Sequence, residues 1–161
     1  MSIEKVRAYF AQFGMEKRIL EFDVSSATVE LAAQAVGVEG KQIAKTLSFL
    51  LGDACILIVA AGDAHVDNKK YKERFGLKAR ILAHDDVPEY IGHAVGGVCP
   101  FAVKDGVKVY LDESLKRFET VFPAAGSANS AIELTIPELE KYSKFDGWVD
   151  VCKDWRTDAE G

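Results

Sequence analysis

The chain has 161 residues, of which 48% are hydrophobic and 28% are charged, and its formal net charge is −5. A chain of this length and hydrophobicity can bury a sizeable core, which excludes a disordered protein and predicts one domain over residues 1–161. Its acidic balance argues against a protein that coats nucleic acid, because such proteins use an excess of Lys and Arg to neutralise phosphates.

The first part of the chain is predicted to contain two helices and a short strand. Apolar residues at helical spacing indicate a first helix over residues 3–13, and the strand follows at residues 18–23. A second helix is expected to end at Gly37. Three hydroxyl side chains before this helix suit an N-cap: Ser25, Ser26 and Thr28. Capping is the simpler role for the two serines.

The most informative stretch is an apolar strand that contains a lysine. Apolar runs at residues 43–51 and 54–61, joined by a Gly-Asp turn, predict a β-hairpin whose second strand is covered on both faces. At a period of two residues, Lys45 falls in the same row as Phe49 and other apolar side chains. Burying an ammonium group without a partner is costly. Lys45 therefore either lies at the end of the strand with its head in water, or faces a cavity that holds an anion.

The next segment holds the main concentration of basic residues. Residues 67–75 predict a polar helix, and Lys78 and Arg80 extend its positive charge. Such a run is usually the solvated face of a helix, and contact with a phosphate backbone is the alternative. A short strand at residues 79–82 and a helix over residues 84–91 are expected next.

Two loops of small residues follow. The first, at residues 92–103, contains Gly96, Gly97 and Pro100, and it can expose backbone amides that bind an anion or a carbonyl oxygen. A tight crossover between strands is the alternative. The second loop, at residues 124–130, lies between two predicted strands.

The order of the remaining elements completes the prediction of fold class. A short helical turn is expected at residues 112–116, a helix begins near Pro137, and the chain from Trp155 onward is expected to fray. Further strands are predicted at residues 107–111, 120–123 and 131–135, with a closing strand or turn near Trp148. This order lacks regular strand–helix alternation, and it favours an α+β fold with a mixed, mainly antiparallel sheet.

Cysteine and histidine spacing predicts no metal centre. The cysteines, Cys55, Cys99 and Cys152, are odd in number and dispersed, which fits free thiols in a reducing compartment. No apolar run is long enough to span a bilayer, and the N-terminus lacks the apolar core of a signal peptide. We therefore expect a cytoplasmic protein without a metal, a cofactor or a membrane anchor.

Three segments, in this order, resemble the YbaK/ProX family of aminoacyl-tRNA deacylases, which also occurs as the editing insertion of bacterial prolyl-tRNA synthetases. They are the lysine in Ile43-Ala44-Lys45-Thr46-Leu47, the loop Gly96-Gly97-Val98-Cys99-Pro100, and Ala125-Gly126-Ser127 followed by Ile132-Glu133-Leu134. The likeness extends from about Arg18 to Tyr142.

The resemblance implies a partly rolled sheet with flanking helices and a pocket at one end. It implies hydrolysis of the ester at the 3′ end of a mischarged tRNA without metal or cofactor, with tRNA as partner and a synthetase as a further candidate partner. Lys45 would anchor the phosphate of the terminal adenosine, and the backbone from Gly96 and Gly97 to Pro100 would polarise the ester. The implied substrate contacts are Thr28, Thr46, Val98, Cys99, Gly126 and Ser127.

Three functions remain distinct at this stage. The first is a trans-editing deacylase, whose nucleophile could be water, a ribose hydroxyl or the substrate's own side chain. The second is a non-catalytic module that binds tRNA or a nucleotide in the same pocket. The third is an esterase with Cys99 as nucleophile, although a buried or pocket-lining thiol is the simpler role for Cys99. Leu20 and the pair Asn129-Ser130 depart from the cysteine-specific branch of the family, which argues against specificity for cysteinyl-tRNA.

Overall fold

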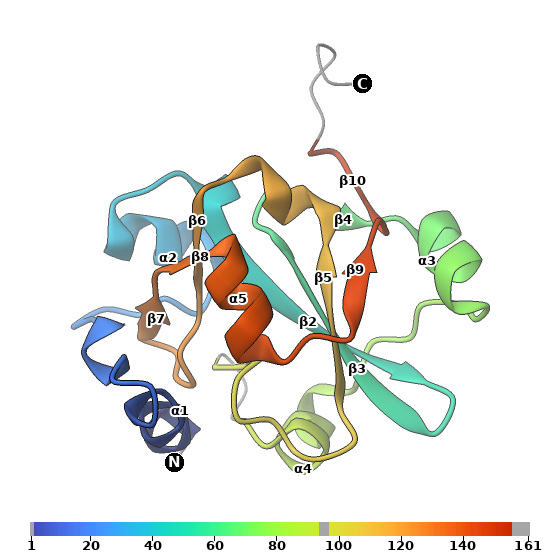
Figure 1. The fold of residues 1–161 in the computed structure, drawn as a ribbon. Coiled ribbons are helices and arrows are strands. Elements are labelled where there is room, and N and C mark those ends of the chain that lie inside the picture. The colour runs from blue at the N-terminus through green and yellow to red at the C-terminus, as the bar shows by residue number, and fades with distance from the viewer. Residues whose placement is uncertain (1, 94–96, 156–161) are drawn as a thin grey trace.

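A curled six-stranded sheet forms the centre of the molecule (Figure 1). The computed structural model describes residues 2–93 and 97–155. In that part of the chain, the strand order of the sheet is β8-β6-β2-β3-β5-β9. Its strands are β2 (Ile43–Leu51), β3 (Ala54–Ala61), β5 (Lys108–Asp112), β6 (Thr120–Pro123), β8 (Leu134–Thr135) and β9 (Gly147–Val149).

The hairpin of β2 and β3 is the longest strand pair of the sheet. Gly52 in its turn has a φ of +63°, a left-handed conformation that glycine adopts without strain. The register places Lys45 opposite Ala60 and Phe49 opposite Ile56. β3 lies between β2 and β5, and the residues after its first position are at most 5% exposed. The predicted hairpin with a covered second strand is confirmed.

The strands pair in both directions. β2 is antiparallel to β3 and parallel to β6, whereas β3 and β9 both run parallel to β5. Two short antiparallel pairs complete the β-structure: β1 (Ile19–Glu21) with β7 (Ser130–Ile132), and β4 (His65–Val66) with β10 (Cys152–Lys153). Four of the seven strand pairs in the described residues are antiparallel. The α+β class with a mixed sheet is confirmed.

Aromatic side chains pack the helices against the sheet and against one another. Tyr71 contacts Phe49 of β2 with 5.1 Å between ring centroids, and Phe10 contacts Tyr142 at 5.5 Å. Across the described residues, no helix combines the length and the apolar character that crossing a membrane requires. The helices are α1 (Ser2–Ala11), α2 (Val29–Val36), α3 (Asn68–Phe75), α4 (Val87–Ile91) and α5 (Ile136–Ser143), with 3-10 turns η1 (Glu16–Arg18), η2 (Gly40–Gln42), η3 (His84–Asp86) and η4 (Glu113–Arg117).

Two predicted strands differ from the structure. Residues 79–82 form no strand, because only an isolated bridge between Ile81 and Phe49 joins them to β2, so this prediction is wrong. The strand expected at residues 131–135 is split. β7 pairs with β1 whereas β8 pairs with β6, so the chain has to change direction at Glu133 between them.

The C-terminal side of the described chain is also more ordered than predicted. The sequence predicts fraying from Trp155 onward, but Trp155 is only 8% exposed; residues 156–161 lie outside the described residues. Its ring lies 5.0 Å from the guanidinium carbon of Arg117, and its carbonyl oxygen accepts a hydrogen bond from Nη1 of that arginine. This stacking ties the end of the described chain to η4.

Candidate active site

A cavity of about 280 Å³ lies where the start of α2, the first half of β2 and two loops meet. Apolar side chains of α2, β2 and β6 form much of its wall. Polar groups enter it from several segments that are distant in sequence. The lining includes four residues that the sequence predicted: Thr28, Lys45, Thr46 and Val98. It also includes two serines that the sequence did not predict, Ser26 and Ser130.

Lys45 lines this cavity and is only half-buried. No hydrogen bond or ion pair joins its ammonium group to another residue in the described chain. Burial lowers the pKa of Lys45 below 10.5, while the Cys152 sulfur and the carboxylates of Asp63 and Glu30 oppose that shift. Lys45 is therefore a cation that has lost part of its hydration without gaining a bonded counter-ion.

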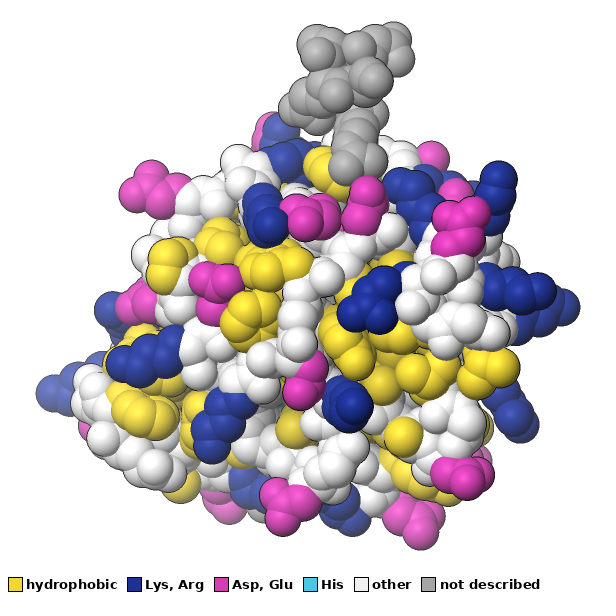
Figure 2. All heavy atoms as spheres, turned by 45° about the vertical axis from the view of Figure 1, so that its right-hand side comes forward, with side chains coloured by type: hydrophobic (Ala, Val, Ile, Leu, Met, Phe, Trp, Pro, Cys, Tyr) yellow, Lys and Arg dark blue, Asp and Glu magenta, His cyan; other side chains and the backbone are white. Residues whose placement is uncertain are grey.

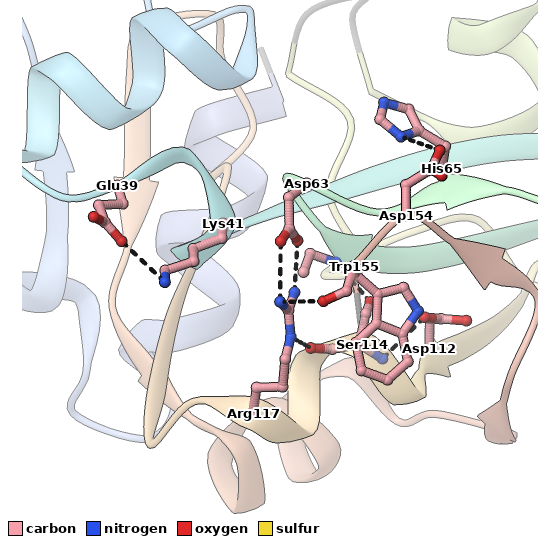
Figure 3. A network of polar contacts seen from close by, with 10 residues as sticks. Glu39, Lys41, Asp63, His65, Asp112, Ser114, Arg117, Asp154 and Trp155 are labelled. Atoms are coloured by element: carbon pink, nitrogen blue, oxygen red, sulfur yellow. Dashed lines mark hydrogen bonds and ion pairs between the residues drawn. The ribbon is translucent and has the colours of Figure 1, made fainter. Parts of the chain in front are cut away.

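The carboxylate of Asp63, which favours the charged form of Lys45, is already paired with another cation. Asp63 pairs with Arg117 through both of its oxygens, at 3.0 Å and 2.5 Å, as Figure 3 shows. The bidentate geometry suits a guanidinium better than an ammonium group. Arg117 also donates to the carbonyl oxygens of Ser114 and Trp155, which fixes its position. Because Arg117 holds Asp63, the Lys45 ammonium remains available to an anionic ligand.

The two small-residue loops meet beside the cavity. A Cβ placed on Gly97 would lie 2.7 Å from the carbonyl carbon of Gly126 and 2.7 Å from the backbone nitrogen of Ser127, so the backbones are in direct contact. Gly126 itself has a φ of +99°, which favours glycine. The next residue, Val98, lines the cavity. Gly96 lies outside the described residues.

Three hydroxyl groups give the cavity a pattern of donors and acceptors. The hydroxyl oxygens of Ser26 and Thr46 are buried and have no hydrogen-bond partner in the described structure. Ser130 differs, because its oxygen lies 2.6 Å from that of Ser127, which donates its proton to Oδ1 of Asn129. The proton of Ser130 is thus directed to Ser127, and its lone pairs remain free to accept. Two residues of the cavity wall therefore carry hydroxyl groups that can still donate or accept, and a third carries one that can still accept.

The three hydroxyl residues before α2 have roles that differ from the predicted ones. Thr28 is the N-cap, because its hydroxyl accepts a bond from the Leu31 amide at 3.2 Å. Ser25 accepts from the Ala27 amide outside the helix. Ser26 faces the cavity, so the expectation that the two serines serve as caps is wrong. Thr28 combines capping with a place in the cavity wall.

Cys99 and Pro100 lie in the same loop but away from the cavity wall. The Cys99 sulfur is fully buried, 3.6 Å from Nε2 of His93, and that nitrogen also contacts the carbonyl oxygen of Phe101 at 2.6 Å. Burial raises the pKa of Cys99 to about 12, and a hydrogen bond to the Phe101 carbonyl opposes the rise only in part. Pro100 lines a different cavity that also contains Tyr9. The thiol is protonated at neutral pH and cannot act as a nucleophile there.

Thiol reagents should therefore leave the native protein unmodified and its activity unchanged. All three cysteines are buried, which denies the reagent access as well as lowering the thiolate fraction. The measurement is the release of thionitrobenzoate from a disulfide reagent, first under native conditions and then in denaturant. Three thiols should react only after unfolding. Rapid labelling of one thiol together with loss of activity would support a cysteine nucleophile instead.

Some site residues gave no signal in the sequence. The sequence marks Ser130 only as a departure from one branch of the resembling family, and Phe122 and Ala124 only as parts of a strand and a loop, although all three line the cavity. Their place in the cavity depends on the parallel pairing of β6 with β2, a contact between segments about eighty residues apart. Among the described residues, no group of three or more His, Cys, Asp or Glu lies close enough to hold a metal ion.

Comparison with known families identifies the class of protein that has this fold and cavity. The model of the aminoacyl-tRNA editing domain matches residues 24–142, which is most of the chain. The chain therefore belongs to the aminoacyl-tRNA editing domain family, and the resemblance found in the sequence is confirmed.

Individual relatives agree with this assignment. The chain is 57% identical over 156 residues to the uncharacterized protein YwhH of Bacillus subtilis, covering 96% of this chain and 99% of that protein. It is 31% identical over 135 residues to the proline–tRNA ligase of Halalkalibacterium halodurans, covering 83% of this chain but only 22% of the ligase. A crystal structure provisionally described as a trans-editing enzyme for prolyl-tRNA synthetase superposes with a TM-score of 0.84 at 29% identity, covering 94% of this chain and 97% of that one.

Proposed function

We propose that this protein is a trans-editing hydrolase that removes the amino acid from mischarged tRNA. The observation that carries the proposal is Lys45, a half-buried cation without a bonded counter-ion, placed in the wall of a cavity in an editing-domain fold. The 3′ end of tRNA supplies the missing anion, since a phosphate precedes its terminal adenosine. The similarity to a structure provisionally described as a trans-editing enzyme for prolyl-tRNA synthetase supports editing in trans.

The proposed reaction is hydrolysis of the ester between the amino acid and the terminal ribose. Water is consumed, the acyl–oxygen bond breaks, and the products are the free amino acid and a tRNA with its ribose hydroxyl restored. An aminoacyl ester is already activated, so positioning and stabilisation of the developing oxyanion can supply the needed rate. The proposal therefore requires no metal.

Each part of the cavity has a role in this proposal. Lys45 holds the phosphate, and the backbone of residues 97–98, braced against Gly126, lies beside the ester carbonyl. Ser26 and Thr46 donate to oxygen atoms of the bound end, and Ser130 accepts from a donor such as the α-ammonium group. The match to proline–tRNA ligases supports tRNA(Pro) as the tRNA and a prolyl-tRNA synthetase as the working partner.

The test is a deacylation screen of the purified protein with alanyl-, cysteinyl-, seryl- and threonyl-tRNA, in the presence and absence of a chelator. We expect release of amino acid from at least one of them at a rate that the chelator does not change. Binding of tRNA that depends on Lys45, with no release from any charged tRNA, would identify a binding module in place of an enzyme.

Thr46→Val should lower kcat/KM by about 3- to 10-fold without destabilising the protein. Valine fills nearly the same volume, and it removes a buried hydroxyl that has no partner in the free protein, so folding loses nothing. The lost hydrogen bond to substrate is worth about 0.5–1.5 kcal/mol. Ser48→Ala, two residues along the same side of β2 and outside the cavity wall, is the control and should change neither quantity. A drop in melting temperature for Thr46→Val would contradict this assignment.

A further inference from the structure

The charge of the chain is divided unevenly. Residues 67–80 contain six Lys or Arg and two Asp or Glu, a net charge of +4 in a chain whose formal net charge is −5, so the remaining residues together carry −9. The six cations lie on α3 and the segment that follows it. They are Lys69, Lys70, Lys72, Arg74, Lys78 and Arg80.

Two of these cations are used within the protein, and four are not. Lys70 donates to the carbonyl oxygen of Cys152 at 3.0 Å and pairs with Asp150. The Arg74 guanidinium lies 5.1 Å from the ring centroid of Phe75. The other four side chains are exposed and make no hydrogen bond or ion pair to any residue in the described ranges: Lys69, Lys72, Lys78 and Arg80. Figure 2 turns this side forward and shows Lys and Arg side chains gathered on the right, around a hydrophobic patch.

α3 is fixed to the sheet rather than loosely attached to it. The Asp67 carboxylate caps it by accepting from the amides of Lys69 and Lys70, and Tyr71 is fully buried against Phe49. The amide of Asp67 also donates to the carbonyl oxygen of Val151 at 2.8 Å. The free cations are therefore presented by a rigid element, which favours a defined docking geometry over a mobile basic tail.

The basic helix lies on the same side of β2 as Lys45. Side chains alternate along a strand, so Lys45 and Phe49 project to one side, and α3 covers Phe49 there. Lys45 and Phe49 are four positions apart, which is about 13 Å along the strand. β10 links the two positions, because Cys152 lies within electrostatic reach of Lys45 and its carbonyl oxygen accepts from Lys70 of α3. A nucleic acid whose end enters the cavity could thus continue past β10 to α3.

We propose that α3 and its following segment, residues 67–80, form the docking surface for the phosphate backbone of the tRNA acceptor stem. This inference rests on the proposed function, since it takes the 3′ end to lie at Lys45. Four unpaired cations on a rigid helix match the regularly spaced charges of a nucleic acid backbone, and they supply affinity without sequence readout. The trinucleotide CCA has no acceptor stem, so on this proposal the surface should favour a whole tRNA over its 3′ end.

The test compares a double charge reversal on α3, Lys72→Glu with Lys78→Glu, with a control reversal at two exposed lysines on other elements, Lys17→Glu with Lys141→Glu. Both variants change the net charge equally. The probes are uncharged tRNA and the trinucleotide CCA, and the measurement is the dissociation constant as a function of salt concentration. Neither probe requires that the protein be catalytic.

We expect the α3 variant to bind tRNA about tenfold or more weakly and to lose about one to two units of the slope of log K against log salt, because each lost phosphate contact removes about 0.7 to 0.9. Its affinity for CCA and the tRNA affinity of the control variant should stay unchanged. Equal weakening in both variants, or no weakening in either, overturns the docking surface. Failure of every charged tRNA in the deacylation screen, with tRNA binding at α3 intact, would instead overturn the proposed function alone.

Discussion

Lys45→Met is expected to lower deacylation by about 10²- to 10³-fold, the effect typical of removing one preorganised electrostatic group from an active site. Methionine retains the length and apolar stem of lysine, so packing along β2 is preserved. Only the cation that is proposed to grip the terminal phosphate is removed. The rate of amino acid release from charged tRNA, under single-turnover conditions, measures the effect on chemistry separately from product release.

The same substitution should leave the protein at least as stable as the wild type. The pKa of Lys45 is lower in the folded protein than in the unfolded chain, because burial disfavours the ammonium form. A lowered lysine pKa means that the charged group opposes folding at every pH below the folded-state value, and that this cost is relieved as pH rises toward 10.5. At neutral pH methionine removes the cost, and thermal unfolding should show an equal or higher melting temperature.

Lys41→Met provides the matched control for this pair of results. Lys41 is an exposed lysine on η2, four residues before Lys45, and it pairs with Glu39 at 3.2 Å. Its replacement should change neither rate nor melting temperature, since exposed ion pairs contribute little. If Lys45→Met loses stability and activity together, Lys45 is a structural residue and the assignment of the site fails.

The pH dependence follows from the same shift. The proposed role needs the ammonium form, so the enzyme-catalysed rate should fall as pH rises through a pKa that lies below that of an ordinary lysine. Lys45→Arg should move this fall to higher pH, because a guanidinium remains charged throughout. Rates are taken as the excess over spontaneous hydrolysis at each pH, because the ester itself becomes labile in base.

Much of the sheet could be predicted from local pattern. The apolar runs on either side of Gly52 indicated the hairpin, and continuous apolarity indicated that β3 is covered on both faces. The break at Glu133 could not be predicted, because it arises from β7 and β8 choosing different partner strands. Local alternation contains no information about which strand lies alongside.

The candidate site, too, could be predicted only where a local pattern indicated it. Lys45 stood out because a charge among apolar residues needs an explanation wherever it occurs. The absence of an ion pair between Lys45 and Asp63 could not be predicted. It depends on Arg117, which holds Asp63 and lies 54 residues from it in sequence. The place of Ser26 in the cavity wall was likewise not predictable, since serine before a helix usually indicates a cap. Polar contacts between distant segments follow from the fold and leave no local pattern.

Gly97→Ala is expected to lower the rate of deacylation by about 10²-fold because it forces the two loops apart. The added Cβ would meet three backbone atoms, namely the carbonyl carbon and oxygen of Gly126 and the nitrogen of Ser127, at 2.7 to 2.8 Å. Backbone atoms cannot rotate away as the end of a long side chain can, so one loop has to shift. A displacement of about 1 Å at a positioned carbonyl can cost about 10²-fold in rate.

The stability of Gly97→Ala separates this effect from general unfolding. Overpacking a close contact typically costs about 1–3 kcal/mol, which a domain of this size can tolerate. The variant should therefore remain folded, with a reduced melting temperature and unchanged binding of tRNA at α3, while amino acid release slows by about 10²-fold. Gly147→Ala is the control, since a Cβ at Gly147 meets no atom within 4 Å, and it should behave as the wild type. Full activity in Gly97→Ala would show that contact between the loops is not required, and the backbone of residues 97–98 would lose its proposed place beside the ester.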